Sequence, residues 1–158
     1  DKEGSLPFYI NQSNMGGSQI IDANNEFIKD AIQINVKTLD QLNELKDASI
    51  ALIKIDVEGH ELNVLKGAKV TISKNMPAIL FEQSASEIID GSSSVIKYLK
   101  ELGYEFFAIK KNFYCGESVV GRFFSLACRL LFGERLDFVK VKAFRKTFHS
   151  MILAMPKS

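Results

Sequence analysis

The sequence predicts an α/β fold with a mostly parallel sheet and an antiparallel strand at its edge. Three short apolar segments carry this prediction, at residues 51–57, 78–82 and 104–109. Each has the length of a buried strand and is rich in aliphatic or aromatic residues. Helical segments separate them, which is the order expected for parallel strands joined by crossover helices. A last apolar segment at 150–155, closed by Pro156, is expected to be the antiparallel edge strand.

Composition is that of an ordinary globular protein. The chain has 158 residues, 46% of them hydrophobic and 25% charged, and we treat residues 1–158 as one domain with a sizeable core. A formal net charge of +1 gives no reason to expect a nucleic-acid partner. No apolar run approaches the length of a transmembrane helix. Two cysteines do not make a disulfide framework, so we expect free thiols in a reducing, cytoplasmic compartment.

The N-terminal part is predicted to hold two strands and a connecting loop. Residues 5–10 read as a short strand near a sheet edge, and residues 11–18 form a polar loop broken by two glycines. Residues 32–36 alternate apolar and polar side chains, which is the period of a half-exposed strand. Thr38 follows as the cap of a short helix that leads into the central strand.

The chain is organised around residues 51–66. The strand that opens this stretch gives way to apolar residues spaced three and four apart up to residue 72, which mark one face of a helix. Asp56 and Glu58 therefore lie at the carboxyl end of the strand, where open α/β sheets bind their ligands. Gly59 suits the turn because it tolerates a positive φ.

The next elements extend this pattern. Glu82 ends the second strand, and a parallel pair would bring it to the same sheet edge as Asp56. Residues 84–86 begin a loop beside that edge. The serines at 92–94 are expected to cap a helix that ends at Gly103, before the third strand.

The C-terminal part offers two surface features. Residues 122–132 carry an apolar helical stripe, which is more often a core or subunit contact than a membrane-surface helix, although arginines flank it. Four basic residues follow between positions 140 and 146, namely Lys140, Lys142, Arg145 and Lys146. A cluster of this kind is usually a solvated surface, and the other interpretation is a site for an acidic substrate.

Three segments together resemble the signature of the FkbM-type methyltransferases. Residues 53–61 and 64–68 match the family's pattern of hydrophobic-K-I-D-V-E-G-x-E followed by x-V-L-x-G-A. Thr38-Leu39-Asp40 matches the upstream T-L-D, and residues 77–82 match the downstream P-x-I-L-x-E. Their order and spacing make the resemblance specific over residues 33–82.

The resemblance implies a Rossmann-like, S-adenosylmethionine-dependent methyltransferase fold with a seven-stranded sheet. In that fold the donor lies on a glycine-rich loop after the first strand, and an acidic residue after the second strand holds its ribose. Neither feature precedes Ile50, so we expect the C-terminal half of such a fold, within a longer protein. A sheet without its first strands would expose an edge and an apolar face.

The resemblance also places Asp56 and Glu58 at the active-site edge. We predict Asp56, Glu58 and Glu82 as catalytic residues, with Asp56 also contacting S-adenosylmethionine. Transfer of a methyl group to a hydroxyl requires close positioning and a base for the hydroxyl proton. The predicted acceptor is a sugar or another small natural product. His60 falls at a variable motif position and receives no role, and Glu61 is expected to start the helix or to form a structural ion pair.

Three other interpretations remain open at this point. Asp56 and Glu58 would serve as plain caps of the following helix if the edge had no chemistry. Together with His60 and Glu82 they would hold a divalent metal in a hydrolase, but no dedicated metal-binding spacing is present and we predict no metal. A non-catalytic binding or assembly domain would use Phe123–Phe132 as its contact surface, and this segment is also where a homodimer would form.

Overall fold

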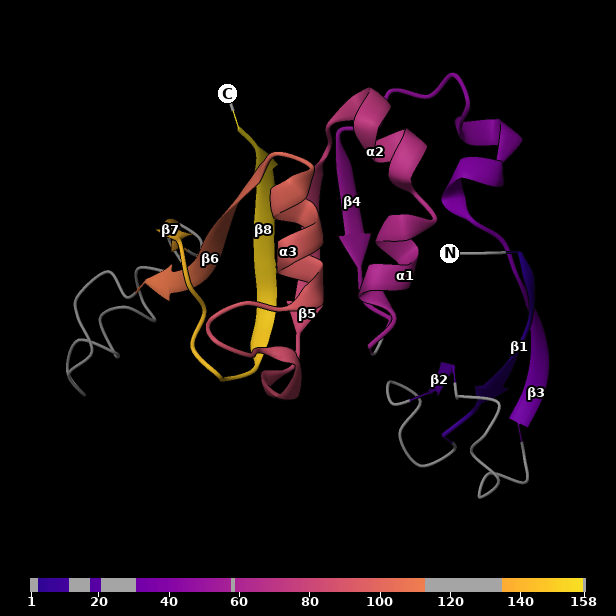
Figure 1. Ribbon diagram of the computed structural model, residues 1–158, viewed down its shortest axis with the longest axis horizontal. Coiled ribbons are helices and arrows are strands. Elements are labelled where there is room, and N and C mark those ends of the chain that lie inside the picture. Colours follow the sequence, from indigo (N-terminus) through magenta and orange to yellow (C-terminus); the bar gives the residue numbers. More distant parts are fainter. Residues whose placement is uncertain (1–2, 12–17, 21–30, 58, 113–134, 158) are drawn as a thin grey trace.

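The computed structural model describes residues 3–11, 18–20, 31–57, 59–112 and 135–157. Within these ranges the chain forms two β-sheets and three α-helices (Figure 1). The smaller sheet lies at one end of the molecule, beyond the helices, and the larger sheet occupies the other end.

The small sheet is antiparallel and has the order β2-β1-β3. Its strands are β1 (Gly4–Tyr9), β2 (Gln19–Ile20) and β3 (Ala31–Val36). The two strands predicted in this part of the sequence are confirmed, and β2 is too short to have given a periodic signal. The described side chains of β1 and β3 are half-buried or exposed, so this sheet contributes little to the hydrophobic core.

The large sheet has the order β4-β5-β8-β6-β7. Its members are β4 (Leu52–Ile55), β5 (Ala78–Gln83), β6 (Tyr104–Asn112), β7 (Arg135–Val141) and β8 (His149–Pro156). The β4–β5 pair is parallel, and the other three neighbouring pairs are antiparallel. The α/β class and the four predicted strands of this sheet are thus confirmed.

The prediction of a mostly parallel sheet with its antiparallel strand at the edge is wrong. β8 is antiparallel as expected, but it lies between β5 and β6. Because both neighbours are antiparallel to β8, β6 runs in the same direction as β5 and β4. A direct β5–β6 pair would be parallel. With β8 between them, the sheet has two antiparallel pairs there instead. The two edge strands of the described sheet are β4 and β7. The sequence pattern did not predict β7, which is antiparallel to β6.

The helices are short and follow the parallel strands. The single helix predicted after β4 is divided into α1 (Glu61–Lys66) and α2 (Lys69–Asn75), because the chain turns at residues 67–68. The third helix is α3 (Ser94–Glu101). The hydroxyl of Ser93 accepts a hydrogen bond from an amide of its first turn, so the predicted serine cap is confirmed.

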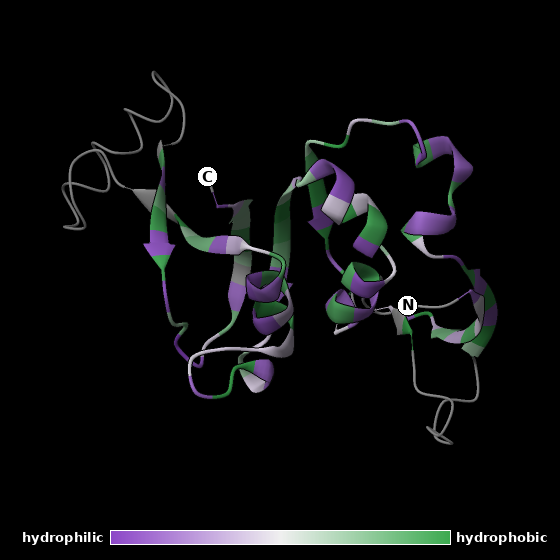
Figure 2. Ribbon diagram, turned by 45° about the horizontal axis from the view of Figure 1, so that its top comes forward, coloured by the Kyte–Doolittle hydropathy of each residue, from purple (hydrophilic) through white to green (hydrophobic). Residues whose placement is uncertain are grey.

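The core lies between the helices and one face of the large sheet. Alternate residues of the strands are fully buried on this face, and their neighbours on the opposite face are half-buried or exposed. Figure 2 shows hydrophobic residues along the middle strands and hydrophilic residues on the outer turns of the helices. The buried hydrophobic residues are Ile55, Leu65, Ala68, Ile72, Ile79, Phe81, Ile88, Val95, Ile96, Leu99, Tyr104, Phe106, Phe144, Ile152 and Ala154.

Side-chain hydrogen bonds fix the amino ends of the strands. The Tyr104 hydroxyl donates to the carbonyl of Pro77 at 2.9 Å, and burial raises the pKa of Tyr104 to about 12. Asn75 accepts from the Ile50 amide at 3.1 Å and donates to the carbonyl of Thr71 at 3.0 Å. The starts of β4, β5 and β6 are thereby tied to the end of α2.

The segment that begins at Thr38 docks on the corner between α1 and α2. It forms the short 3-10 helices η2 (Leu39–Gln41) and η3 (Asn43–Leu45) in place of the predicted helix, with Thr38 and Gln41 in a capping box. The Asp40 amide donates to the carbonyl of Gly67 at 3.0 Å. A Cβ atom on Gly67 would lie 3.2 Å from the Cβ of Thr38, so any larger residue would have to push Thr38 away by a small distance.

The carboxylate of Asp40 caps α2. One oxygen accepts from the Val70 amide and the other from the Thr71 amide, each at 2.9 Å. These are two of the amides that the first turn of a helix leaves without a partner. The resemblance motifs T-L-D and G-A therefore have a shared structural explanation, because the first supplies the cap and the second supplies the corner that it caps.

Removing this cap should destabilise the fold. We expect Asp40→Ala to lower the free energy of unfolding by about 1–2 kcal/mol, because two helix amides lose their acceptor. Asp47→Ala is the matched control, since within the described ranges Asp47 is exposed and has no hydrogen-bond or ion-pair partner. Urea denaturation of both variants checks the prediction, and equal losses would contradict the capping role.

Candidate functional site

The carboxyl edge of the parallel pair brings two of the predicted catalytic residues together. Ile55 of β4 is in register with Phe81 of β5, so the next residues, Asp56 and Glu82, follow side by side. Side chains alternate along a strand, which places both carboxylates on the face of the sheet opposite the helices. Lys54 lies on the same face and its ammonium is 3.0 Å from an Asp56 carboxylate oxygen. Both partners of this ion pair are about half exposed.

The turn after β4 has the conformation that its glycine allows. Gly59 has φ +91°, and a Cβ atom there would meet nothing within 4 Å. The backbone conformation, and not a close contact, therefore requires glycine at this position. The His60 amide donates to the carbonyl of Val57 at 3.3 Å and closes the turn. Glu58, the third predicted catalytic residue, lies outside the described residues, and its role stays a prediction.

Glu61 has a more specific place than the sequence suggested. It starts α1 as expected, but its side chain is 4% exposed and forms no ion pair among the described residues. One carboxylate oxygen accepts from the Gly59 amide at 3.1 Å, and the other is buried without a hydrogen-bond partner in the described structure. The spacing of Glu61 from Leu65 places it on the buried stripe of the helix, which is the signal that could have revealed its burial.

His60 connects the turn to the small sheet. One ring nitrogen, Nε2, lies 3.4 Å from the carbonyl of Ile20 in β2, and the other lies 3.4 Å from the Asn63 side-chain amide. A carbonyl only accepts, so Nε2 carries the hydrogen in this arrangement. Both contacts are long for hydrogen bonds and provide positioning more than stability. His60 received no predicted role, and the structure gives it this linking position.

A buried polar network follows β5. Gln83 is fully buried, and its side-chain oxygen accepts from the Ser93 hydroxyl at 2.5 Å. Its amide nitrogen donates to Glu87 at 2.5 Å, and the same Glu87 oxygen accepts from the Ser84 amide at 3.1 Å. The network fixes the loop beside the carboxyl edge of β4 and β5. We call this edge, which carries Asp56 and Glu82, the acidic edge. Sequence reasoning did not single out Gln83, although its alternation with Phe81 places it on the core face.

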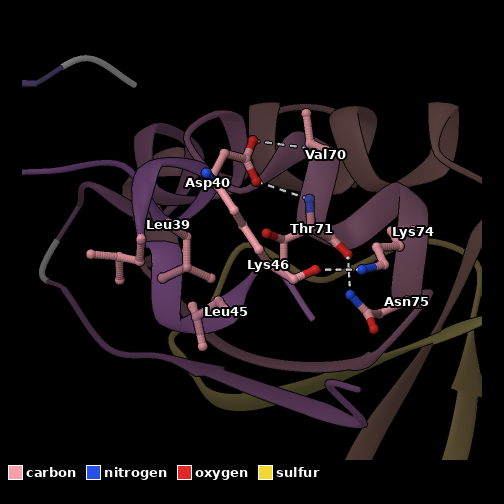
Figure 3. A pocket seen from close by; sticks show the side chains of 9 residues that line it. Leu39, Asp40, Leu45, Lys46, Val70, Thr71, Lys74 and Asn75 are labelled. Atoms are coloured by element: carbon pink, nitrogen blue, oxygen red, sulfur yellow. Dashed lines mark hydrogen bonds between the residues drawn. The ribbon is translucent and has the colours of Figure 1, made fainter. Parts of the chain in front are cut away.

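A pocket of about 100 Å³ lies elsewhere, between the 3-10 helices and α2 (Figure 3). Three of its polar side chains already serve as structural contacts. Asp40 caps α2, the Lys74 ammonium donates to the carbonyl of Lys46 at 2.5 Å, and Asn75 holds the Ile50 amide. We therefore do not assign it as the active site. Its lining residues are Leu39, Asp40, Leu42, Leu45, Lys46, Val70, Thr71, Lys74 and Asn75.

The other interpretations gain no support from the part of the chain that can be described. Within that part, no group of three or more His, Cys, Asp or Glu side chains is arranged to hold a metal ion. No described helix is long and apolar enough to cross a bilayer. Phe123–Phe132, the predicted contact surface, and Cys115 and Cys128 lie outside the described residues.

The comparison with protein families decides the classification. A family model described as the methyltransferase FkbM domain matches residues 2–106, well over half of the chain. The chain belongs to the FkbM methyltransferase domain family. The resemblance predicted from the sequence is thus confirmed. Searches of the curated proteins and of the solved structures each gave no match.

The matched region of the FkbM domain contains the whole acidic edge. It includes the cap at Asp40, the turn after Asp56 and the strand that ends near Glu82. Strands β7 and β8 and their connection lie beyond it. The family assignment therefore bears on the acidic edge directly, and the C-terminal strands have to be interpreted from their own geometry.

Glu61 should contribute to stability through its bond to the turn. We expect Glu61→Ala to lower the free energy of unfolding by about 1–3 kcal/mol, because the Gly59 amide loses its acceptor. Glu61→Gln is the matched control, since the amide oxygen still accepts that bond, and it should lose less than half as much. Urea denaturation of the two variants measures the difference. Identical losses would mean that the hydrogen bond to Gly59 is not the stabilising contact.

Proposed function

We propose that this chain carries the catalytic edge of an S-adenosylmethionine-dependent O-methyltransferase. The acceptor is the hydroxyl group of a sugar or another small natural product. One observation carries the proposal: Asp56 and Glu82 stand side by side on one face, at the carboxyl end of a parallel pair, inside the region that the FkbM family model matches. Ligands of open α/β sheets bind at this end of the strands.

The chemistry requires a base at this edge. S-adenosylmethionine, when bound, supplies an electrophilic methyl group on a positively charged sulfur. The acceptor hydroxyl must lose its proton as its oxygen attacks, and a carboxylate within hydrogen-bond reach takes that proton. We assign this role to Asp56, whose side chain is about half exposed and so open to a ligand.

The neighbours of Asp56 have supporting roles. Lys54 holds the carboxylate by a short ion pair, and an exposed pair of this kind orients a side chain more than it stabilises the fold. Glu82 lies on the same face and is assigned to hold the acceptor hydroxyl, together with Glu58 of the turn. A concentration of carboxylates at one edge also attracts the cationic end of the donor.

The residues at this edge fit one end of S-adenosylmethionine. Its methionyl end carries a sulfonium and an ammonium group, and Asp56 and Glu82 offer carboxylate oxygens to cationic groups of this kind. Its adenosine end requires other residues, because no glycine-rich loop follows a described parallel strand at this edge. We therefore assign Asp56 to the methyl and methionyl end of the donor and leave the adenosine outside the described residues.

Replacing the proposed base should abolish most activity without unfolding the protein. We expect Asp56→Asn in the full-length protein to lower kcat about a hundredfold or more, because the amide cannot accept the hydroxyl proton. The measurement is transfer of radiolabelled methyl from S-adenosylmethionine to a panel of sugars, with circular dichroism as the check of folding.

Two controls accompany this experiment. Asp47→Asn makes the same change at an exposed carboxylate that has no partner among the described residues, and it should leave kcat unchanged. A chelator should also have no effect, whereas a metal-dependent hydrolase at this edge would lose activity. Unchanged turnover of Asp56→Asn would remove Asp56 from the mechanism.

A further inference from the structure

Two loops at the carboxyl edge of β5 are fixed to each other. The first follows β5 and contains Gly91, and the second joins β7 to β8 over residues 142–148. The Phe144 amide donates to the carbonyl of Gly91 at 2.9 Å. Gly91 has φ +75°, and a Cβ atom there would lie 3.1 Å from the Cβ of Ala143. The second loop is therefore pressed against the first, and glycine is required at the contact.

The second loop is also anchored to the core. β7 and β8 are both antiparallel to β6, so their connection has to return along the sheet, and it does so over the helix-covered face. Phe144 is buried there, with its ring edge-on to Phe106 at 6.0 Å and to His149 at 5.3 Å. The carbonyl of Arg145 accepts from the Thr147 amide at 2.8 Å and from the His149 ring at 3.0 Å.

The turn at residues 145–148 of this loop presents two cations without counter-charges, and Lys142, where the loop leaves β7, is a third exposed cation. Arg145 and Lys146 are exposed, and neither side chain has a hydrogen-bond or ion-pair partner in the described structure. Lys54 and Lys140 of the same sheet differ, because each pairs with a carboxylate. Phe148, on the same turn, is 61% exposed. The turn therefore combines two free positive charges with an open aromatic ring.

The turn lies across the sheet edge from the proposed base. His149 begins β8 opposite Gln83 at the end of β5, and β5 is the neighbour of β4, which leads to Asp56. Two strand spacings, about 10 Å, separate β8 from β4. Asp56 and Glu82 belong to the helix-free side of the edge and the turn belongs to the helix-covered side, so a ligand lying over the edge meets both.

Two carboxylates lie in the loop after β5, and neither pairs with the cations of the turn. Glu87, in the loop after β5, is half-buried and its carboxylate is bonded to Gln83 and Ser84. Asp90 of the same loop is exposed and makes no ion pair with either cation. Neither carboxylate is paired with Arg145 or Lys146, so both cations stay free to bind a ligand.

We infer that Arg145 and Lys146 bind an acidic group of the methyl acceptor, which makes the acceptor an anionic saccharide or a comparable small acid. The inference rests on the proposed function, because it takes the acceptor to lie over the edge beside Asp56. A guanidinium matches the geometry of a carboxylate or phosphate, and a neighbouring ammonium adds a second donor. Phe148 offers its ring to the apolar face of a sugar.

Nuclear magnetic resonance titration of the ¹⁵N-labelled full-length protein tests the inference without requiring turnover. The probes are glucuronic acid, glucose 6-phosphate and glucose. We expect the two acids to shift amide signals of the two loops, including Gly91 and Phe144, and we expect glucose at equal concentration to leave them unshifted. The two acids separate a carboxylate preference from a phosphate preference, and binding of either one supports the inference.

The double variant Arg145→Gln/Lys146→Gln should weaken binding of the acids at least about tenfold, because both charge-assisted contacts are lost. Lys97→Gln/Lys100→Gln removes the same charge from α3 and should bind as the unchanged protein does. Equal shifts with glucose, no shifts with either acid, or unweakened binding to the double variant would overturn the inference. Donor binding, measured separately, would be unaffected in those cases, so the proposed methyltransferase function would still stand.

Discussion

The carboxylate of Asp40 holds the corner on which the rest of the structure depends. By accepting the Val70 and Thr71 amides, it lets the chain end α1, turn at Gly67 and start α2 within two residues. Without this cap, the first turn of α2 would leave polar groups without partners next to the core. The corner aligns α2 with the sheet and so sets where β5 starts beside β4. The segment that begins at Thr38 thus controls the acidic edge without contributing a group to it.

The acidic edge follows from that alignment. A parallel pair ends both strands at one place, so two carboxylates meet on the helix-free face while Glu61 and Gln83 fill the helix-covered face. The two faces therefore have different tasks. Buried hydrogen bonds on the covered face keep the turn and the loops in place, and on the free face the Asp56 carboxylate is about half exposed. A carboxylate held by one short contact and otherwise open suits proton transfer better than a fully buried one does.

Local sequence patterns predicted most of the strands and helices, but they did not predict which strands pair with each other in the sheet. The periodicity around Asp56 and Glu82 was sufficient to place the strands, the turn and the shared edge, because these depend on contacts between segments adjacent in sequence. The position of β8 depends on which distant strands pair, and side-chain alternation contains no information about that choice. β7 was missed because Asp137 and Lys140 interrupt its apolar residues. Glu61 was assigned from its charge, whereas its place on the apolar stripe of α1 decided its burial.

Calorimetric titration of S-adenosylmethionine into the full-length protein tests whether this edge is a methyl-transfer site. We expect saturable binding at one site, weakened by Asp56→Asn and unchanged by Asp47→Asn, because Asp56 is assigned to the cationic end of the donor. Absence of binding to the folded full-length protein would contradict the claim. Binding of equal strength in both variants would place the donor away from this edge.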